Sequence, residues 1–480
     1  MFKYLKDEKL QLFWIIFHTL IGLSAISTKW VLIGWFYVVV ISTIISLFGK
    51  EPEYVIMCVS CYILGFEILA RGVHASPYIP AEVGKYFVLF MFAFGLSIDP
   101  VRKQNKLYGV SLLLLSIPAL FFASYSYKQI VFNYLGILTL IIGVIFYSRH
   151  ILTLDKFIGL CRIMVYSILM LCMYAVFRAS SFEKLEFNVS ANFQTAGTIT
   201  NQVSSLLGTG ATIIVLIYVT GKSIFNKFID IILLLLFFGV GLISFSRGGV
   251  ISGLIAILLI LLFPRIQKSY RNKSSLDIDV QNISPVSIIL IIGVFAFSFF
   301  VINSISDNYL YYRYMGKTER EIKTGFDKDF NANKFSSGRA HIMEGDINIF
   351  LDNPGFGVGV GNSRYVRMLG GKPLNIASHT EATRLLAEHG SLGLIMFFMI
   401  FIYPIFKAFG ERSNFQRLLI ISFFTISITV TFHNAMRTCI TPVLFALTFL
   451  LVVPNNIDKS YFSARRTTIF KRRTPIPNNV

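Results

Sequence analysis

The chain has 480 residues, of which 55% are hydrophobic and only 14% are charged. Because soluble globular proteins average about 25% charged residues, this composition argues against an ordinary water-soluble enzyme and favours a protein of the lipid bilayer. Lys and Arg total 44 against 25 Asp and Glu, a formal net charge of +19. Such a positive excess can serve binding to nucleic acid, to anionic lipid or to an acidic substrate, or it can reflect membrane topology. The positions of the charges along the chain must distinguish these explanations.

The chain begins with the features of a signal anchor. Lys3, Lys6 and Lys9 precede an apolar run that starts near Leu10, no small-residue cleavage site follows, and hydrophobic spans continue. The five cysteines all fall inside apolar runs, a pattern that predicts neither a disulfide framework nor a zinc site.

Apolar windows of about 20 residues, the length that crosses a bilayer as a helix, predict an all-α polytopic membrane protein with 12–14 transmembrane helices. The fourteen candidate spans are 11–28, 30–48, 53–70, 84–98, 108–124, 130–147, 157–178, 203–220, 228–243, 249–263, 286–303, 392–409, 417–432 and 438–453. Because 84–98 and 249–263 are short, twelve or thirteen spans remain open.

Lys and Arg in the short loops predict the orientation. With the N-terminus in the cytoplasm, about 24 Lys and Arg lie inside and about 8 lie in the short outer loops, which agrees with the positive-inside rule. The basic stretch from Lys459 to Arg473 belongs to the inner set, where anionic lipid head groups attract it. Topology therefore explains much of the charge excess.

This topology divides the chain into four parts. They are an N-terminal transmembrane bundle at 1–303 with about eleven spans, a large extracytoplasmic loop at 304–391, C-terminal transmembrane helices at 392–453 and a basic cytoplasmic tail at 454–480. Loops as long as 304–391 are usually functional in a compact protein, so we expect most of the soluble chemistry there.

The first polar motif is Ser246-Arg247-Gly248-Gly249. It separates two apolar runs that are together too long for one span, so it predicts a tight helical hairpin at the outer membrane face. An Arg near hydrocarbon depth is costly and usually pairs with something. Arg247 is therefore either an interfacial side chain that snorkels to the head groups or a bidentate ligand for phosphate.

The second motif lies in the large loop. Ser337 as an N-cap and Pro354 as a stop predict an amphipathic helix with Arg339 in its first turn. A cation is unfavourable there, because the helix N-terminus already carries partial positive charge. Arg339 is thus either a solvated surface residue or part of an anion site at which two positive features converge.

A glycine-rich stretch at 355–362 follows this helix. It lacks the flanking strand and the Lys of a P-loop and faces away from cytoplasmic nucleotides, so we reject nucleotide binding. Its alternating glycines instead predict a backbone that bends close to the membrane surface or to a ligand.

The third motif runs from Ser378 to Gly390. Ser378 and Glu381 have the spacing of a capping box and Gly390 is a fitting C-terminal stop, which predicts a short helix over 379–389. Glu381, Arg384 and Glu388 would then lie along one side of the helix, where the simplest interpretation is an ordinary ion-pair ladder.

His379 would occupy the first turn of this helix, where the helix dipole keeps the imidazole neutral. A neutral His beside an anionic substrate can act as a base or a hydrogen-bonding group, and the alternative is a capping-region His without chemistry. His341, His389 and His433 also lie outside, but no spacing of the HExxH kind links them, so no metal centre is predicted.

Taken together, these motifs resemble the O-antigen ligase and polymerase superfamily of bacterial polysaccharide assembly. The resemblance covers about 195–410 and rests on an ordered series: the residues 246–249, Gly338-Arg339, the stretch 353–359, His379 and the stretch 386–394. The stretch 197–202 is weakly similar to an earlier loop of the family. Many members carry Asn where this chain has Thr380, which leaves the subgroup and the acceptor open.

The resemblance implies a metal-independent glycosyltransferase without a cofactor, which works on the outer side of the bacterial cytoplasmic membrane. Its donor would be a glycan on undecaprenyl pyrophosphate, and its acceptor either a lipid-A core, for a ligase, or another lipid-linked glycan, for a polymerase; nucleic acid is not a partner. We assign Arg247 and Arg339 to the pyrophosphate and His379 to the acceptor hydroxyl. The residues expected to support substrate binding are Glu381, Arg384, Glu388 and His389.

A transporter or flippase for a polyprenyl-linked glycan or a small molecule is the alternative from another class. Such proteins usually show paired internal repeats or charges near the bilayer midplane, whereas the polar motifs here gather in outer loops. A transporter would move a glycan without changing its length or carrier, so the reaction product distinguishes the two classes. An adhesion or scaffold role for the large loop has no feature in its favour.

Overall fold

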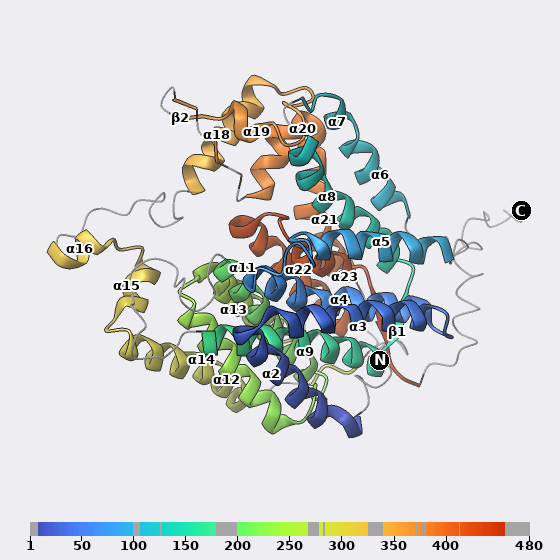
Figure 1. The fold of residues 1–480 in the computed structure, drawn as a ribbon, viewed down its shortest axis with the longest axis vertical. Coiled ribbons are helices and arrows are strands. Elements are labelled where there is room, and N and C mark those ends of the chain that lie inside the picture. The colour runs from blue at the N-terminus through green and yellow to red at the C-terminus, as the bar shows by residue number, and fades with distance from the viewer. Residues whose placement is uncertain are drawn as a thin grey trace, which may run out of the picture.

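Helices make up nearly all of the regular structure in the computed structural model (Figure 1). The structure describes residues 8–98, 106–124, 127–178, 199–266, 278–281, 284–324, 339–369, 372–373, 375–376, 378, 380–411 and 413–456. The helices of the first half are η1 (Glu8–Leu10), α2 (Gln11–Ser27), α3 (Lys29–Leu47), α4 (Pro52–Gly72), α5 (Val83–Ile98), α6 (Lys106–Ser116), α7 (Pro118–Phe121), α8 (Tyr127–Tyr147), α9 (Leu154–Arg178) and α11 (Thr200–Tyr218).

The second half contains further membrane helices and the short helices of the large loop. They are α12 (Lys227–Ile243), α13 (Arg247–Ile266), α14 (Pro285–Ile305), α15 (Tyr309–Met315), α16 (Glu319–Thr324), α18 (Arg339–Asp352), α19 (Ser363–Val366), α20 (Glu381–Phe397), the π-helical turn η4 (Phe398–Ile402), α21 (Tyr403–Gly410), α22 (Asn414–Asn434) and α23 (Ile440–Leu447).

The chain is an all-α polytopic membrane protein, as the hydropathy pattern predicts. Within the described residues, eight helices are long and apolar enough to cross a bilayer, and four more apolar helices are shorter. Each predicted span up to 417–432 coincides with helix over most of its length. The span predicted at 108–124 is divided into α6 and α7, because Pro118 has no backbone N–H to continue the helical hydrogen bonds.

The last predicted span, 438–453, is wrong as a single helix. It forms the eight-residue helix α23 and then the strand β4 (Leu451–Val453), which pairs in parallel with β1 (Ile151–Thr153) so that Ile151 lies opposite Leu451. Hydropathy cannot distinguish a spanning helix from a buried apolar run whose backbone groups find partners in a strand. A second short pair, β2 (Met368–Leu369) with β3 (Lys372–Pro373), is antiparallel.

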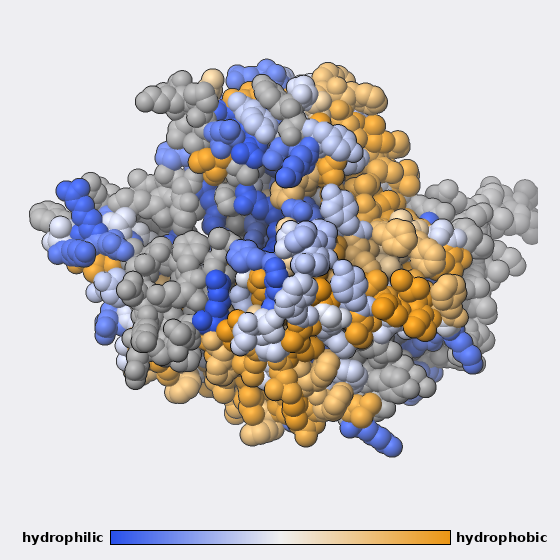
Figure 2. All heavy atoms as spheres, viewed as in Figure 1, coloured by the Kyte–Doolittle hydropathy of each residue, from blue (hydrophilic) through white to orange (hydrophobic). Residues whose placement is uncertain are grey.

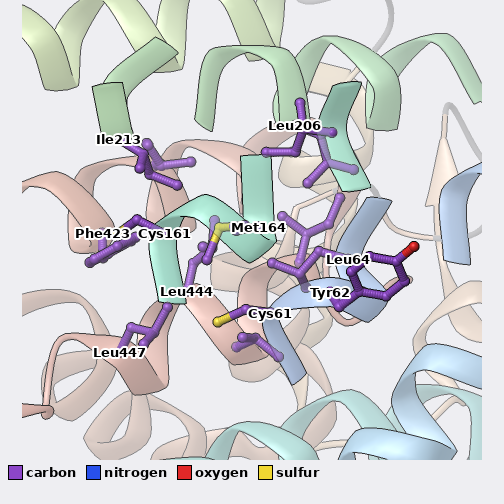
Figure 3. Close-up of a cluster of buried hydrophobic side chains, with 14 of the residues drawn as sticks. Cys61, Tyr62, Leu64, Cys161, Met164, Leu206, Ile213, Phe423, Leu444 and Leu447 are labelled. Carbon is purple, nitrogen blue, oxygen red and sulfur yellow. The ribbon is translucent and has the colours of Figure 1, made fainter. Parts of the chain in front are cut away.

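The centre of the bundle is formed by α4, α9 and α11 with α22 and α23. Side chains from all five helices meet there without solvent access, among them Tyr62, Met164, Leu206 and Leu444 (Figure 3). The helices α3 and α14 instead leave large apolar side chains exposed, such as Ile45 at 68% and Phe300 at 72%. Apolar side chains exposed on this scale are stable only against lipid, which places α3 and α14 at the periphery of the bundle.

Three glycines allow α11 and α13 to pack with their backbones in contact. A Cβ at Gly208 would lie 2.4 Å from the carbonyl oxygen of Gly249, and one at Gly253 would lie 2.7 Å from the Cα of Gly208. Small residues of this kind bring helices together in membranes, where no hydrophobic effect drives their association. The close packing fixes the start of α13, and with it Arg247, against α11.

The segment 304–391 lies over one part of this bundle. In Figure 1, α15 and α16 extend at the left edge, whereas α18, α19 and the start of α20 form a group at the top. The helix α18 packs against α20, and α20 also contacts α6. Figure 2 shows hydrophilic side chains gathered in a hollow between this upper group and the bundle below it.

The helix contact predicts a strong effect of one added side chain. We expect Gly208→Val to lower the thermal unfolding midpoint of the purified protein in detergent, because overpacking a close contact costs about 1–3 kcal/mol. The matched control is Gly293→Val on α14, where nothing lies within 4 Å of the added Cβ. Equal midpoints for the two variants, measured by intrinsic fluorescence, would contradict the packing described.

Candidate active site

The hairpin predicted at residues 246–249 is present. Helix α12 ends at Ile243 and α13 begins at Arg247, with Phe245 in a left-handed conformation (φ 54°) between them. The side chain of Arg247 is buried, and its Nη1 donates to the carbonyl oxygen of Arg313 at 2.9 Å. Arg313 Nε in turn donates to the carbonyl oxygen of Phe245 at 3.2 Å, so the hairpin and α15 hold each other.

The start of α11 connects the hairpin to the end of α22. Ser246 Oγ donates to Asn201 Oδ1 at 2.8 Å, and Gln202 Nε2 donates to Asn434 Oδ1 at 3.1 Å. Asn201 and Gln202 belong to the stretch that weakly resembles a family loop. The structure therefore places this stretch beside the Arg247 hairpin, although about 45 residues separate them in the chain.

Helix α18 begins at Arg339, which confirms that this residue lies in a first turn, and the helix ends at Asp352, before the predicted stop. The predicted N-cap, Ser337, lies outside the described residues. The pKa of Arg339 is lowered by its burial and by the positive charges of Arg247 and Arg437. Arg247 and Arg339, 92 positions apart in the sequence numbering, thus act on each other electrostatically.

Two further arginines join them. Burial and the charges of Arg247 and Arg339 lower the pKa of Arg313 to about 10. Arg437, in the turn after α22, acts on Arg339. Four guanidinium groups from four separate segments therefore share one region, an arrangement that favours an anion. The sequence motifs missed Arg313 and Arg437. For Arg437 the available signal was a lone Arg in the short segment between the predicted spans 417–432 and 438–453.

Glu381, Arg384 and Glu388 form a buried ion cluster rather than an exposed ladder. Arg384 pairs with Glu381, and its Nη1 lies 3.0 Å from Glu388 Oε2. Each of the three residues is no more than 4% exposed. Ser363 Oγ donates to Glu388 Oε1 at 2.8 Å, so the cluster also ties α19 to α20.

The predicted capping box is wrong. Helix α20 begins at Glu381, its N-cap is Thr380, and no side-chain bond caps it. Ser378 Oγ instead donates to Asp346 Oδ2 on α18 at 2.6 Å, and Glu381 pairs with Arg384. Ser378 thus donates to a carboxylate and Glu381 accepts from a guanidinium, and such charge-assisted hydrogen bonds are stronger than those between neutral groups.

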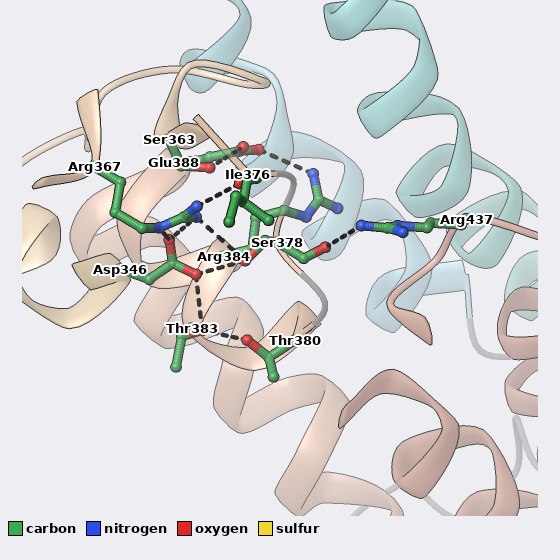
Figure 4. A network of polar contacts seen from close by, with 10 residues as sticks. All are labelled: Asp346, Ser363, Arg367, Ile376, Ser378, Thr380, Thr383, Arg384, Glu388 and Arg437. Atoms are coloured by element: carbon green, nitrogen blue, oxygen red, sulfur yellow. Dashed lines mark hydrogen bonds and ion pairs between the residues drawn. The ribbon is translucent and has the colours of Figure 1, made fainter. Parts of the chain in front are cut away.

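Asp346 is the centre of a second buried network that no sequence motif indicates (Figure 4). Its carboxylate pairs with Arg367 and also accepts from Ser378 Oγ and from Thr383 Oγ1, the latter at 3.0 Å. Arg367 Nη1 donates to the carbonyl oxygen of Ile376 at 2.6 Å, and both charged side chains have no solvent exposure. The network joins α18 to the segment that leads into α20.

The glycine-rich stretch bends close to the end of the first part of α20, and its Gly361 lines a pocket. Val358 N donates to the carbonyl oxygen of Ala387 at 3.0 Å, and Gly359 N donates to that of Glu388 at 3.1 Å. Gly357 has a φ of 69°, and a Cβ there would lie 2.6 Å from the Ala387 carbonyl oxygen. Only glycine permits this approach to the end of the first part of α20.

Gly390 divides α20 as the sequence predicts, because its φ of 60° and ψ of −136° interrupt the helix. His389, just before it, is 1% exposed, and neither ring nitrogen has a hydrogen-bond partner among the described residues. His341 is exposed and lies 3.6 Å from Glu344. The predicted catalytic residue His379 lies outside the described residues, between Ser378 and Thr380.

A pocket of about 430 Å³, open solvent included, lies between α8, the ion cluster and the turn after α22. It is lined by Gln129, Phe132, Asn133, Gly361, Ser363, Arg364, Ser378, Glu381, Arg384, Glu388, Ala435, Met436 and Arg437. Three of the four predicted substrate-binding residues are in this lining, whereas His389 is not. Ser378 and Thr380, which flank His379 in the chain, are both buried.

The Asp346 network should be sensitive to the loss of one charge. We expect Arg367→Met to lower the free energy of unfolding by about 3–5 kcal/mol, because Asp346 would remain as a buried, unpaired carboxylate. The control is Lys156→Met, which breaks the exposed pair with Glu51 and should cost about 0–1 kcal/mol. Denaturant unfolding in detergent measures both, and similar losses for the two variants would argue against the network.

Comparison with known proteins agrees with this geometry. Residues 231–398 match the family model described as O-antigen ligase, a range that includes the Arg247 hairpin, α18, the glycine-rich stretch and the ion cluster. No match to the chain was found among the curated proteins or the solved structures. The chain is thus a multi-pass membrane protein in which residues 231–398 match the O-antigen ligase family.

Proposed function

We propose that the protein transfers a glycan from undecaprenyl pyrophosphate to an acceptor during the assembly of bacterial surface polysaccharide. The observation that carries this proposal is the electrostatic coupling of Arg247, Arg313 and Arg437 to Arg339, together with the place of Arg437 in the lining of a polar pocket. A diphosphate is the part of such a donor that needs several cations at once. The match to the O-antigen ligase family supports the same class of reaction.

In the proposed reaction, Arg247 and Arg339 hold the pyrophosphate and stabilise the negative charge that develops on it. The acceptor hydroxyl attacks the anomeric carbon and gives its proton to His379. The bond between that carbon and the phosphate oxygen breaks, and the electron pair leaves with the pyrophosphate. Because pyrophosphate is a competent leaving group, the carboxylic acid that glycosidases use to protonate the leaving oxygen is not needed.

The buried ion cluster has a supporting role in this scheme. Arg384 forms ion pairs with both Glu381 and Glu388, and all three residues line the pocket. The two carboxylates are therefore neutralised by Arg384. Their hydrogen bonds to Ser363 Oγ and to the backbone N–H of Met436 hold two other walls of the pocket in place. The arginines outside the cluster supply the positive charge that a divalent cation supplies in other phosphate chemistry.

His379 and Arg339 provide the direct test. With a lipid-linked glycan as donor, we expect His379→Ala and Arg339→Ala to lower turnover by at least about 100-fold, since each would remove a group that acts in the transition state. The matched controls are His341→Ala, which changes a partly exposed histidine, and Arg320→Gln, which changes an exposed arginine. Near wild-type turnover in folded His379→Ala or Arg339→Ala would refute the assigned role.

The reaction product separates this proposal from transport. A transferase lengthens the glycan or moves it to a new carrier, whereas a flippase returns the donor unchanged on the other side of the membrane. A lipid-A core acceptor and a second lipid-linked glycan, offered in separate reactions, then distinguish a ligase from a polymerase.

We further propose that the site faces away from the cytoplasm, with both termini in the cytoplasm. All five native cysteines are buried, so a membrane-impermeant maleimide should report on introduced cysteines. In intact spheroplasts, Arg320→Cys should be labelled, whereas Lys227→Cys should be labelled only after the membrane is opened. The reverse pattern would invert the topology and overturn the predicted orientation.

A further inference from the structure

The turn after α22, residues 435–439, is the part of the site that the sequence motifs do not mark. Ala435 has a φ of 45°, a left-handed conformation that is strained for a residue with a side chain. Every residue from Asn434 to Ile440 is buried except Arg437, which is half-buried and lines the pocket. A strained backbone persists only where surrounding contacts hold it, so the contacts of this turn indicate what fixes its conformation.

Two buried carboxylates from different helices hold the backbone of this turn. Glu67 Oε2 on α4 accepts from Cys439 N at 2.9 Å, and Glu381 Oε2 on α20 accepts from Met436 N at 3.2 Å. Both Glu residues have no solvent exposure. Because a buried carboxylate is costly unless it is paired and hydrogen-bonded, these contacts fix the position of the turn strongly.

Arg71 also holds the turn, through the backbone of Arg437 itself. Its Nη2 donates to Glu67 Oε1 at 2.8 Å and to the carbonyl oxygen of Arg437 at 3.1 Å. One guanidinium therefore links the carboxylate on α4 directly to the backbone of the residue that enters the pocket. The negative charge of Glu67 balances Arg71 at this point, so the pair can be buried.

Glycines on two neighbouring helices allow Glu67 and the turn to pack closely against them. A Cβ at Gly84 on α5 would lie 2.4 Å from Glu67 Oε2, and one at Gly136 on α8 would lie 2.8 Å from the carbonyl oxygen of Met436. The turn is therefore in contact with α4, α5, α8 and α20 at once. Its backbone is fixed on several sides, and the Arg437 side chain is directed toward the pocket.

The Arg437 side chain lies between the two groups of charges in the site. Its Nη2 donates to the carbonyl oxygen of Ser378 at 3.2 Å, next to His379 in the chain (Figure 4). Burial and the positive charges of Arg384, Arg364 and Arg71 lower its pKa, and its own charge acts on Arg339. Arg437 thus connects the arginine cluster around Arg339 to the pocket beside Ser378.

We propose that Arg437 is a third phosphate-binding residue of the site and that Glu67, acting through Arg71, is its positioning residue. This inference rests on the proposed function and extends it to residues outside the family-matched range 231–398. Arg437 would contact the diphosphate on the side nearest the acceptor, where the leaving oxygen gains charge. Glu67 would contact no substrate.

The test uses the full-length protein in lipid nanodiscs and three short-chain probes: farnesyl pyrophosphate, farnesyl monophosphate and farnesol. We expect Arg437→Gln to weaken farnesyl pyrophosphate binding about tenfold or more, as the loss of a charge-assisted hydrogen bond predicts, and farnesyl monophosphate binding less. Farnesol binding should not change. Arg437→Lys should restore part of the affinity, and Arg320→Gln, which changes an exposed arginine of α16, should behave as wild type.

Glu67→Gln tests the positioning role, because the amide keeps the shape and can still accept from Cys439 N but cannot balance Arg71. We expect a loss of about threefold in farnesyl pyrophosphate affinity, and none when the same change is made in an Arg437→Gln background. A purely structural role of Glu67 would give losses that add in the double variant, which would overturn this part of the inference.

The outcomes also separate this inference from the proposed function. If Arg247→Gln and Arg339→Gln weaken farnesyl pyrophosphate binding but Arg437→Gln does not, the inference fails and the proposed function stands. If the wild-type protein binds farnesyl pyrophosphate no better than farnesol, the phosphate assignment of Arg247 and Arg339 fails together with that of Arg437.

Discussion

The cost of burying charge is the constraint on which the rest of this structure depends. Glu67, Glu381 and Asp346 are fully buried carboxylates, and each pairs with an arginine, namely Arg71, Arg384 and Arg367. Each carboxylate also accepts at least one further N–H or O–H bond. Because removal of one partner would leave an uncompensated buried charge, these three pairs fix α4, α18, α20 and the turn after α22 relative to one another.

The arginines around Arg339 lie in a different electrostatic environment from these three. Arg313 and Arg339 have pKa values lowered by burial and by neighbouring positive charges. Like charges in a partly dehydrated region repel one another, and a bound polyanion converts that repulsion into attraction. The paired residues therefore form the rigid frame, and in the proposed function the arginines held by it bind the diphosphate. Such prior positioning of cations is what stabilises charge in a transition state without reorganisation.

Backbone contacts made possible by glycine connect the frame to the membrane bundle. Gly208 and Gly253 bring α11 against α13, which carries Arg247 at its first turn, and Gly357 brings the glycine-rich stretch against the end of the first part of α20. A helix start positioned by backbone packing has little freedom to shift. The position of Arg247 is therefore set by the transmembrane helices, whereas the position of Arg339 is set by helix α18 of the large loop.

The sequence by itself determined the helical membrane architecture, the hairpin at Arg247, the place of Arg339 in a first turn and the break at Gly390. It also determined that Glu381, Arg384 and Glu388 pair along one side of a helix, but not that they are buried. These features depend on hydropathy and on spacings of a few residues, which a single chain displays directly. Only the tertiary structure decided that Ser378 binds Asp346, that 438–453 is a short helix and a strand, and that Arg437 enters the pocket. Each of these depends on a partner far away in the chain, such as Glu67 for the turn at Cys439. Local patterns carry no information about which distant carboxylate or strand will satisfy a buried group.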